Sequence, residues 1–364
     1  MLFLALLLVS FQPFSQDKHK EDKPLRNDGP YISYQADGMH LTTVVNGKIT
    51  SKAYSNGSAP KSISVTSNDG SREFSVSLAP IEAPTSSYAL PNETLVLSDP
   101  HGDLESFVSI LKAANVVNDK LEWTYGKNHL VIIGDVFDRG DDVIPIFWLC
   151  YKLDYEAKRA GGVLHYLIGN HEDMVLAGDY RYTEEKYLQL AQSLGIEHKQ
   201  LFQPNTELGR WIRSKNYIET IGPYLFTHAG LSKDFLERNV TVEQVNATMR
   251  PFLGASKKNI KNDSLALFLF DRSGPIWYRG MVVNEPKYNP IDEPTLDALL
   301  AKYRVKKIIV GHTIHDEVTA FHHGKVVGVN VKNHHNREKG KSRGLVISAK
   351  GVELVYDNGS RKPL

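Results

Sequence analysis

The stretch Leu130–Gly140 reads LVIIGDVFDRG and joins an apolar run to a cluster of charged side chains. The run Leu130–Ile133 has the length and the branched side chains of a buried strand. Open α/β sheets bind ligands where their strands end, so the carboxylate of Asp135 is placed to bridge two cations. Asp138 and Arg139 follow at a spacing that lets them orient and clamp a phosphate. Taken alone, an Asp-rich helix cap with a surface ion pair explains the stretch equally well.

Four other apolar runs end in the same way, with Asp, His or Asn within two residues of the end of the run. The segments that follow them are Ser98–Gly102 (SDPHG), Gly169–Glu172 (GNHE), His228–Ser232 (HAGLS) and Gly311–Thr313 (GHT). A single His or Asp in such a place is more often a packed side chain or a helix cap than a ligand. Five apolar runs that each end in a candidate ligand are improbable by chance, so together they predict one metal site.

The residue types in these segments favour a centre that acts on phosphate. Asp99 and His101 stand two apart in one loop and can face one metal, while Asn170 offers a neutral carbonyl oxygen. The adjacent His171 can point the other way as a proton donor. Ligands drawn from Asp, Asn and His suit two divalent ions of Mn, Fe or Zn. Two such ions about 4 Å apart can share a water, lower its pKa and present hydroxide to phosphorus.

Other residues near these segments have two interpretations each. Glu172 is either an orienting partner of the ligands or a Glu that starts a helix. Trp211 and Trp277 could form the floor of a substrate groove, although Trp is more often buried by packing. The pairs His322–His323 and His334–His335 lie amid Lys, Asn and Arg, which favours solvated loops over a second metal cluster.

The five segments resemble the calcineurin-like metallophosphoesterases, and within them the phosphoprotein phosphatases, over roughly residues 91 to 330. The resemblance implies an α+β or α/β fold, with a central β-sandwich of two mixed sheets flanked by helices. It also implies two metal ions that share one carboxylate. The implied ligands are, for the first ion, Asp99, His101 and Asp135 and, for the second, Asp135, Asn170, His228 and His312.

The same resemblance implies which residues act on the substrate. His171 corresponds to the general acid, and Asp138 holds it in place. Arg139 and Arg279 correspond to the phosphate-binding arginines, and Asn170 is expected to contact the phosphate as well.

Softer motifs narrow the resemblance further. The segments Gly209–Lys215 and Trp277–Gly280, with the β-rich N-terminal part, look most like the Shewanella-like protein phosphatases. Ser98, Pro100 and the Ala-Gly pair after His228 depart from the wider family pattern without removing a ligand. The resemblance implies a phosphomonoesterase whose partner is a phosphorylated protein or peptide. Phosphotyrosine is its first candidate substrate, with phosphoserine and phosphothreonine as further candidates.

Two alternatives stay open at this point. A dinucleoside polyphosphate hydrolase would use the same site, and the region Gly178–Tyr217, rich in Tyr and charged residues, is expected to decide between the substrates. A non-catalytic binding protein on this fold would have lost ligands, and none of the six is missing.

The composition divides the chain into four parts. Residues 1–16 have the apolar character of a signal peptide, and residues 17–30 have the composition of a linker. Residues 31–90 predict a small β-rich module, because Asn-Gly and Asp-Gly pairs separate its short alternating runs. Residues 91–364 form the predicted catalytic domain, including strands near the C-terminus.

Charge and cysteine content exclude several other classes of protein. The 43 Lys and Arg balance 42 Asp and Glu, which argues against generic nucleic-acid binding or attraction to a membrane surface. The one cysteine, Cys150, lies in an apolar run and is expected in the core rather than as a nucleophile. We expect an exported protein, periplasmic or secreted, with no stable membrane insertion once the signal is removed.

Overall fold

Two six-stranded sheets form the centre of the computed structural model, which describes residues 25–364. The predicted signal peptide and most of the predicted linker lie outside the described residues. The first sheet has the order β17-β16-β15-β7-β8-β9, and β7, β8 and β9 run parallel, so their carboxyl ends meet at one edge. Its strands are β7 (Glu93–Leu97), β8 (His129–Ile132), β9 (Val163–Tyr166), β15 (Gly344–Ser348), β16 (Gly351–Val355) and β17 (Arg361–Pro363).

The second sheet has the order β13-β14-β12-β11-β10-β6, in which β11 and β12 are parallel. Its strands are β6 (Ser87–Tyr88), β10 (Ile218–Ile221), β11 (Tyr224–Thr227), β12 (Lys307–Val310), β13 (Thr319–Phe321) and β14 (Val326–Gly328). Val96 and Val131 of one sheet and Phe226 and Ile309 of the other belong to one buried cluster between them. The predicted sandwich of two mixed sheets is therefore confirmed.

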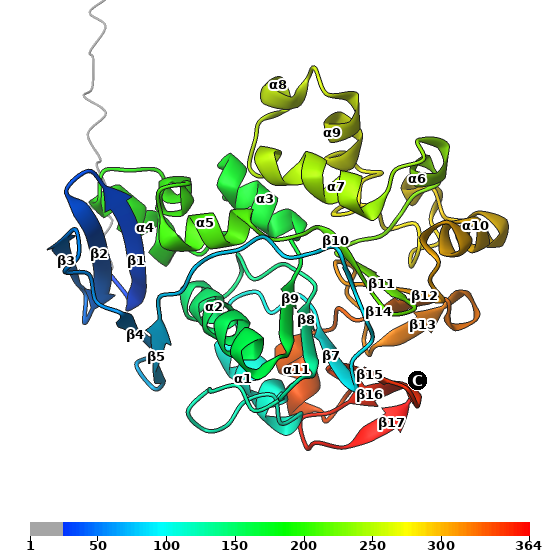
Figure 1. The fold of residues 1–364 in the computed structure, drawn as a ribbon, viewed down its shortest axis with the longest axis horizontal. Coiled ribbons are helices and arrows are strands. Elements are labelled where there is room, and N and C mark those ends of the chain that lie inside the picture. The colour runs from blue at the N-terminus through cyan, green and yellow to red at the C-terminus, as the bar shows by residue number, and fades with distance from the viewer. Residues whose placement is uncertain (1–24) are drawn as a thin grey trace, which may run out of the picture.

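Helices cover the outer faces of the sandwich (Figure 1). Leu95 and Leu130, whose side chains point away from the second sheet, join the core beneath them. Cys150 of α2 is fully buried, as predicted. Among residues 25–364, no helix combines the length and the apolar character that a membrane span requires. The helices are α1 (Leu104–Ala113), α2 (Val143–Ala160), α3 (Asn170–Ala177), α4 (Glu185–Ser193), α5 (Glu207–Arg213), α6 (Asp234–Glu237), α7 (Val242–Met249), α8 (Lys257–Ile260), α9 (Ser264–Leu269), α10 (Glu293–Tyr303) and α11 (Asn333–Glu338).

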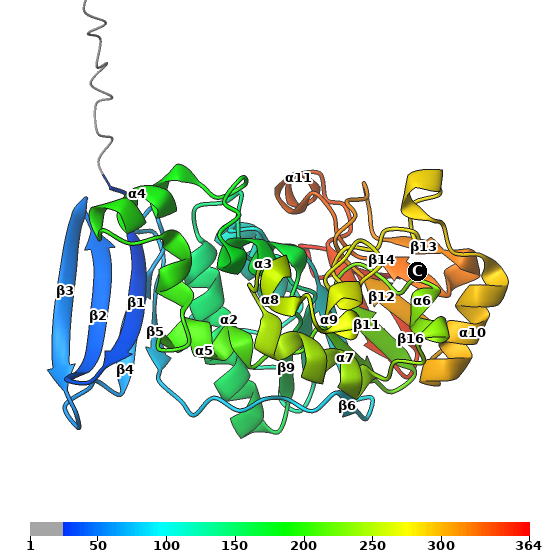
Figure 2. The same ribbon diagram turned by 90° about the horizontal axis from the view of Figure 1, so that it is seen from above.

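The predicted N-terminal β module is present at one end of the molecule, beside α4 and α5 (Figure 2). It consists of a three-stranded and a two-stranded antiparallel sheet. Asn46 and Gly47 make the predicted hairpin turn, with φ of 49° and 76°. The strands are β1 (Asp28–Gln35), β2 (Gly38–Val45), β3 (Lys48–Ser55), β4 (Ser62–Thr66) and β5 (Glu73–Ser77).

Both predicted boundaries of this module differ from the observed strands. β1 begins at Asp28, inside the stretch whose composition indicates a linker, because Asp28 pairs with Val44 of β2 across an irregular register. At the other end, Ser87 and Tyr88 pair with β10 and form the edge of the second central sheet. These pairings join segments distant in sequence, which composition does not reveal.

Candidate metal centre

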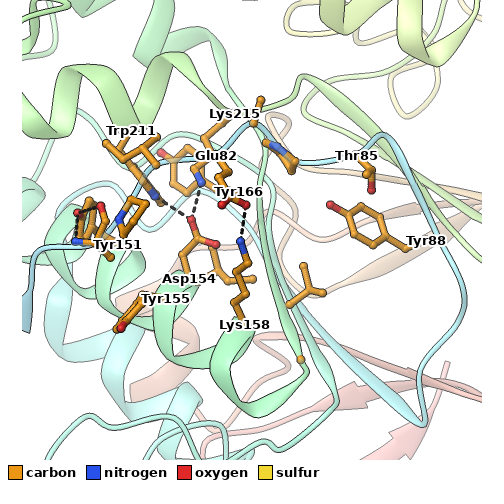
Figure 3. A pocket seen from close by; sticks show the side chains of 18 residues that line it. Glu82, Thr85, Tyr88, Tyr151, Asp154, Tyr155, Lys158, Tyr166, Trp211 and Lys215 are labelled. Carbon is orange, nitrogen blue, oxygen red and sulfur yellow. Dashed lines mark hydrogen bonds and ion pairs between the residues drawn. The ribbon is translucent and has the colours of Figure 1, made fainter.

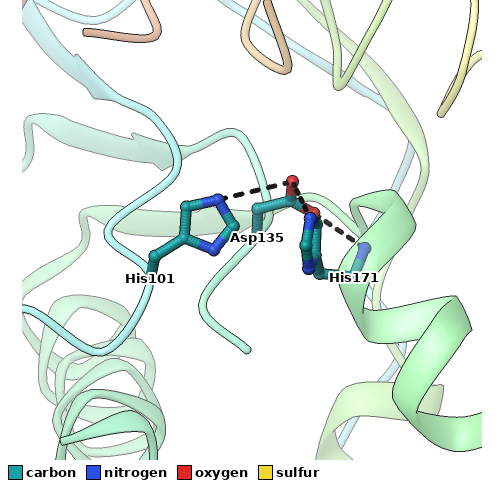
Figure 4. A group of neighbouring side chains, drawn as sticks. All are labelled: His101, Asp135 and His171. Atoms are coloured by element: carbon teal, nitrogen blue, oxygen red, sulfur yellow. Dashed lines mark hydrogen bonds and ion pairs between the residues drawn. The ribbon is translucent and has the colours of Figure 1, made fainter. Parts of the chain in front are cut away.

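The loops that follow β7, β8, β9, β11 and β12 bring their polar side chains to one place. His101, Asp135 and His171 form one close group (Figure 4), and Asp135, His228 and His312 form another. Oδ2 of Asp135 lies 3.9 Å from Nε2 of His101 and 3.1 Å from Nε2 of His228. Asp135 therefore stands between two sets of histidine nitrogens, in the position predicted for a shared ligand.

The two remaining predicted ligands lie beside these groups. Oδ1 of Asn170 is 3.0 Å from Nε2 of His228. Asp99 belongs to neither close group, but its Oδ2 accepts a hydrogen bond from the main-chain N–H of His312 at 3.1 Å. The hydroxyl of Ser98 also donates to this carboxylate. All six predicted ligands thus lie close together where the strands of the sandwich end.

The donor atoms suit bound cations. Among the described residues, Oδ1 of Asp99 and Nε2 of His312 are buried without a hydrogen-bond partner. A buried polar atom without a partner is costly, and a cation would satisfy both. Burial raises the pKa of Asp99 to about 7, while burial, His228 and Arg279 lower the pKa of His312 well below its ordinary value. A neutral imidazole is the form that binds a metal.

The backbone of the centre is unusual, because several residues other than glycine adopt left-handed conformations. Such residues cost about 1 kcal/mol or more each and persist only where their surroundings impose them. Gly311 also has no room for a side chain, since a Cβ there would lie 1.9 Å from Oγ of Ser98. The left-handed site residues are Asp99 (φ 50°), His101 (40°), Asp135 (57°), Asp138 (71°), Arg139 (67°) and His312 (61°).

Glu172 imposes the conformation of the loop after β8. Its fully buried carboxylate accepts the main-chain N–H groups of Asp135 at 2.9 Å and Val136 at 2.8 Å. It also accepts the N–H of Gly169 at 2.7 Å, at the start of α3, and the hydroxyl of Tyr166 at 3.0 Å. Both interpretations of Glu172 are therefore correct, since it caps a helix and orients the neighbourhood of a ligand.

Asn333 plays the same part for the loop after β7, although no sequence motif indicates this. Its amide donates to the carbonyls of Asp99 at 3.1 Å and Ser98 at 3.3 Å. Arg343, which is 2% exposed, donates to Oδ1 of Asn333 at 3.2 Å and pairs with Asp357. Asn333 is the first residue of α11, where a solvated loop was predicted for His334 and His335, so the prediction of a loop there is wrong and no local signal could have revealed the role of Asn333.

His171 and Asp138 have the predicted relationship. Nδ1 of His171 donates to Oδ2 of Asp138 at 2.5 Å, and the hydroxyl of Thr183 donates to Oδ1 of Asp138 at 2.6 Å. Burial alone would lower the pKa of His171, but Asp135 and Asp138 oppose burial and raise it above its ordinary value. The imidazole is thus held as a proton donor.

The two predicted arginines lie on different sides of the centre. Nη2 of Arg139 is 3.4 Å from Nε2 of His171, and its side chain is exposed. Arg279 donates to Oγ1 of Thr313, the residue after His312, at 3.0 Å. Burial lowers the pKa of Arg279, and the charges of Tyr288, Asp99 and Asp135 oppose this shift. Arg139 therefore lies beside His171, and Arg279 lies beside the loop that carries His312.

An exposed aromatic ring borders the same site. Tyr182, in the region expected to shape the cleft, is 46% exposed. Its ring centroid lies 5.3 Å from that of His171 and 5.5 Å from the guanidinium carbon of Arg139. Its main-chain carbonyl accepts the N–H of Arg139 at 3.0 Å. Opposite, the partly buried ring of Trp277 meets that of His312 edge-on at 5.9 Å.

A cavity of about 300 Å³ lies away from the predicted site residues, between residues 79–85 and the helices α2 and α5 (Figure 3). Trp211 lines it, is 2% exposed and donates to Asp154 at 2.9 Å, so this Trp is a packing residue rather than the floor of the metal site. Tyr166, which also lines the cavity, is the residue whose hydroxyl donates to Glu172.

A family model described as calcineurin-like phosphoesterase matches residues 93–316, more than half of the chain. The chain belongs to the calcineurin-like phosphoesterase family. The matched segment begins at β7 and ends after the loop that carries His312, so it contains every predicted metal ligand. As a calcineurin-like phosphoesterase, the protein is a metal-dependent hydrolase of phosphoester bonds.

Known relatives confirm the resemblance to Shewanella-like protein phosphatases. The cold-active protein-tyrosine phosphatase of a psychrophilic Shewanella species has a crystal structure similar to this one, with a TM-score of 0.82 and 31% identity, over 92% of this chain and 98% of that chain. Shewanella-like protein phosphatase 2 of Arabidopsis thaliana is 26% identical over 315 residues, which are 74% of this chain and 77% of that protein. Shewanella-like protein phosphatase 1 of Plasmodium berghei is 28% identical over 221 residues, and the match spans 60% of each chain.

Proposed function

We propose that this calcineurin-like phosphoesterase removes phosphate from phosphorylated proteins or peptides, with phosphotyrosine as its preferred residue. The observation that carries the proposal is the position of Asp135 between two groups of histidines, next to the His171–Asp138 pair. The similarity to the Shewanella protein-tyrosine phosphatase supports the substrate class.

We further propose that two divalent ions of Mn, Fe or Zn occupy the centre. When bound, such ions supply an activated water and polarise the phosphate oxygens. The donors Oδ1 of Asp99 and Nε2 of His312, which have no protein partner among the described residues, support this proposal. The first ion would be held by Asp99, His101 and Asp135, and the second by Asp135, Asn170, His228 and His312.

The chain's own residues perform the remaining tasks. Arg139 and Arg279 bind the equatorial phosphate oxygens from two sides, which stabilises the charge that develops there. His171 gives the proton on Nε2 to the leaving oxygen as its bond to phosphorus breaks. Asp138 keeps the other nitrogen of His171 protonated and fixes the ring. Tyr182 offers its exposed ring to an aromatic leaving group.

A turnover assay on metal-reconstituted protein tests this function. The substrates are a phosphotyrosine peptide, a phosphoserine peptide and diadenosine tetraphosphate, with Asp135→Asn as the control variant. We expect fastest hydrolysis of the phosphotyrosine peptide, two metal ions per chain by elemental analysis and loss of turnover in the control. If the metal-loaded protein hydrolyses none of these substrates, the proposed enzymatic function is refuted. Preference for diadenosine tetraphosphate would favour the dinucleoside polyphosphate hydrolase instead.

We also propose export of the protein, on the basis of the apolar residues 1–16. Expression in a bacterium with an outer membrane, followed by cell fractionation, tests this. The mature protein should lie in the periplasm or the medium and lack about 16 residues by mass spectrometry. Full-length protein in the cytoplasm would contradict the proposal.

A further inference from the structure

Parts of the chain outside the metal-binding motifs hold the loop Asp138–Asp142, which carries the proposed phosphate-binding arginine. Arg26 donates two hydrogen bonds to the carboxylate of Asp141, at 2.6 and 2.7 Å. The main-chain N–H of Asn68, in the turn between β4 and β5, donates to the carboxylate of Asp142 at 2.6 Å. The N-terminal β module and the segment before it therefore form hydrogen bonds with two residues of this loop, Asp141 and Asp142.

A single buried amine joins these contacts. Lys186 of α4 is 3% exposed, and its Nζ donates to the main-chain carbonyls of Asp141 at 2.6 Å and Asn27 at 2.9 Å. Nζ also donates to Oδ1 of Asn68 at 3.2 Å and lies 3.7 Å from the buried carboxylate of Asp28. Lysine is rarely buried unless it is paired, and here its three N–H groups reach three separate segments.

Close packing transmits the position of this loop to its neighbours. A Cβ on Gly140 would lie 2.3 Å from the carbonyl oxygen of His101, so the two loops are in direct backbone contact. Tyr187, next to Lys186 in sequence, donates its hydroxyl to the carbonyl of Gly140 at 3.3 Å. Arg139, at φ 67°, has a left-handed backbone that its surroundings must maintain.

We propose that Lys186 is a positioning residue through which the N-terminal β module fixes the loop Asp138–Asp142 and with it the place of Arg139. This inference rests on the proposed function, in which Arg139 binds the substrate phosphate. Arg139 is exposed, so the direction of its guanidinium depends on its contacts with His171 and Tyr182 and on the position of the loop that carries it. Without the Lys186 amine, the loop can adopt other conformations. Phosphate binding then weakens because Arg139 is no longer held in one place. Asp138, at the start of the loop, keeps its hydrogen bonds from His171 and Thr183, and the proposed metal ligands keep partners of their own, so the chemical step is less affected.

The test compares Lys186→Met with Lys152→Met in metal-loaded protein. Lys152 is a matched control, because it is also buried, at 7% exposed, but pairs with Glu156 within α2. The probes are p-nitrophenyl phosphate as substrate and inorganic phosphate as competitive inhibitor. In Lys186→Met we expect KM and the inhibition constant of phosphate to rise about fivefold or more, with kcat changed by less than about threefold. The rise in Tm that phosphate causes should shrink in parallel.

Unchanged phosphate inhibition in folded Lys186→Met would overturn the inference, as would an equal effect of Lys152→Met. If Lys186→Met does not fold, Arg26→Ala replaces it, because Arg26 is exposed and its side chain pairs with Asp141 of the loop. Its inhibition constant should rise about twofold or more, and no rise overturns the inference. Failure of the unmodified protein to hydrolyse any phosphate ester would refute the proposed function instead.

Discussion

The carboxylate of Glu172 lies directly behind Asp135 and accepts its main-chain N–H at 2.9 Å. The same carboxylate binds the next N–H along the chain and the start of α3. The residue proposed to join the two metal ions is therefore held by a carboxylate that is not itself one of the proposed ligands. Its position depends on a buried group from another motif.

This relationship predicts the effect of Glu172→Gln. The amide would turn an N–H₂ group toward main-chain N–H donors, so metal affinity should fall about tenfold or more. Glu207→Gln is the matched control, since Glu207 is 1% exposed and accepts hydroxyl groups of Tyr151 and Tyr34 far from the ligands. Metal titrations of both variants measure the difference. Equal affinities would show that Glu172 only stabilises the fold.

His171→Asn should slow alkyl phosphate hydrolysis more than aryl phosphate hydrolysis. A serine alkoxide needs protonation as it leaves, whereas a phenoxide departs more easily. We expect kcat to fall about 100-fold or more for a phosphoserine peptide. The decrease in kcat for p-nitrophenyl phosphate should be smaller by a factor of about ten. Steady-state kinetics on both substrates provide the measurement. Equal losses on the two would count against the acid role.

Tyr182→Leu should lower the preference for aromatic substrates. Loss of the exposed ring beside His171 removes an aromatic contact, so kcat/KM for a phosphotyrosine peptide should fall about three- to tenfold. Tyr182→Phe retains the ring and should behave like the unmodified protein. Hydrolysis of a phosphoserine peptide should change by less than about twofold in both variants. A similar loss of kcat/KM on both peptides would show that Tyr182 acts by positioning Arg139 rather than by stacking on the substrate ring.

A hydrogen-bonded chain at the opposite end of the sandwich predicts acid sensitivity. His129 contacts His165 at 2.9 Å, and His165 donates to the buried Glu219 at 2.5 Å. Burial and His165 lower the pKa of His129 to about 4. In the unfolded chain His129 is therefore protonated below about pH 6.5, whereas in the folded protein it stays neutral down to about pH 4. The stability that this difference contributes is present above pH 6.5 and is lost as pH falls.

Urea unfolding at pH 7 and pH 4.5 checks this prediction. Between pH 7 and pH 4.5 the free energy of unfolding should fall less in His129→Gln than in the unmodified protein. The difference should be about 1–2 kcal/mol, which includes the reduction by solvent screening. His334→Gln, which alters an exposed side chain, serves as the control. The same pH dependence in His129→Gln and the unmodified protein would contradict the prediction.

The sequence predicts that the proposed ligands come together, because each one follows a strand within a few residues. Asp99, Asp135 and Asn170 come after parallel neighbours in one sheet, so local pattern and sheet geometry together bring them to one edge. The buried position of Cys150 follows from its apolar surroundings in the same way. For these features, short-range sequence contains the necessary information.

Residues that act on the ligands from a distance could not be predicted in this way. Asn333 and Lys186 look like ordinary polar residues, and their roles depend on contacts with segments more than 40 residues away. The strand start at Asp28 and the edge strand at Tyr88 likewise depend on partners elsewhere in the chain. His322 illustrates the same limit, since it binds Glu293 at 2.7 Å rather than lying free in a solvated loop.

The left-handed backbone at Asp99, Asp135 and His312 has a consequence for how the protein acquires its ions. Glu172 and Asn333 maintain the loops through hydrogen bonds that need no cation, so the entropy of ordering them is already lost on folding. The proposed ligands are then preorganised, so metal binding should require little further ordering of the backbone. Exchange of one metal for another should then leave the protein's architecture intact, with selectivity decided by the chemistry of the donors.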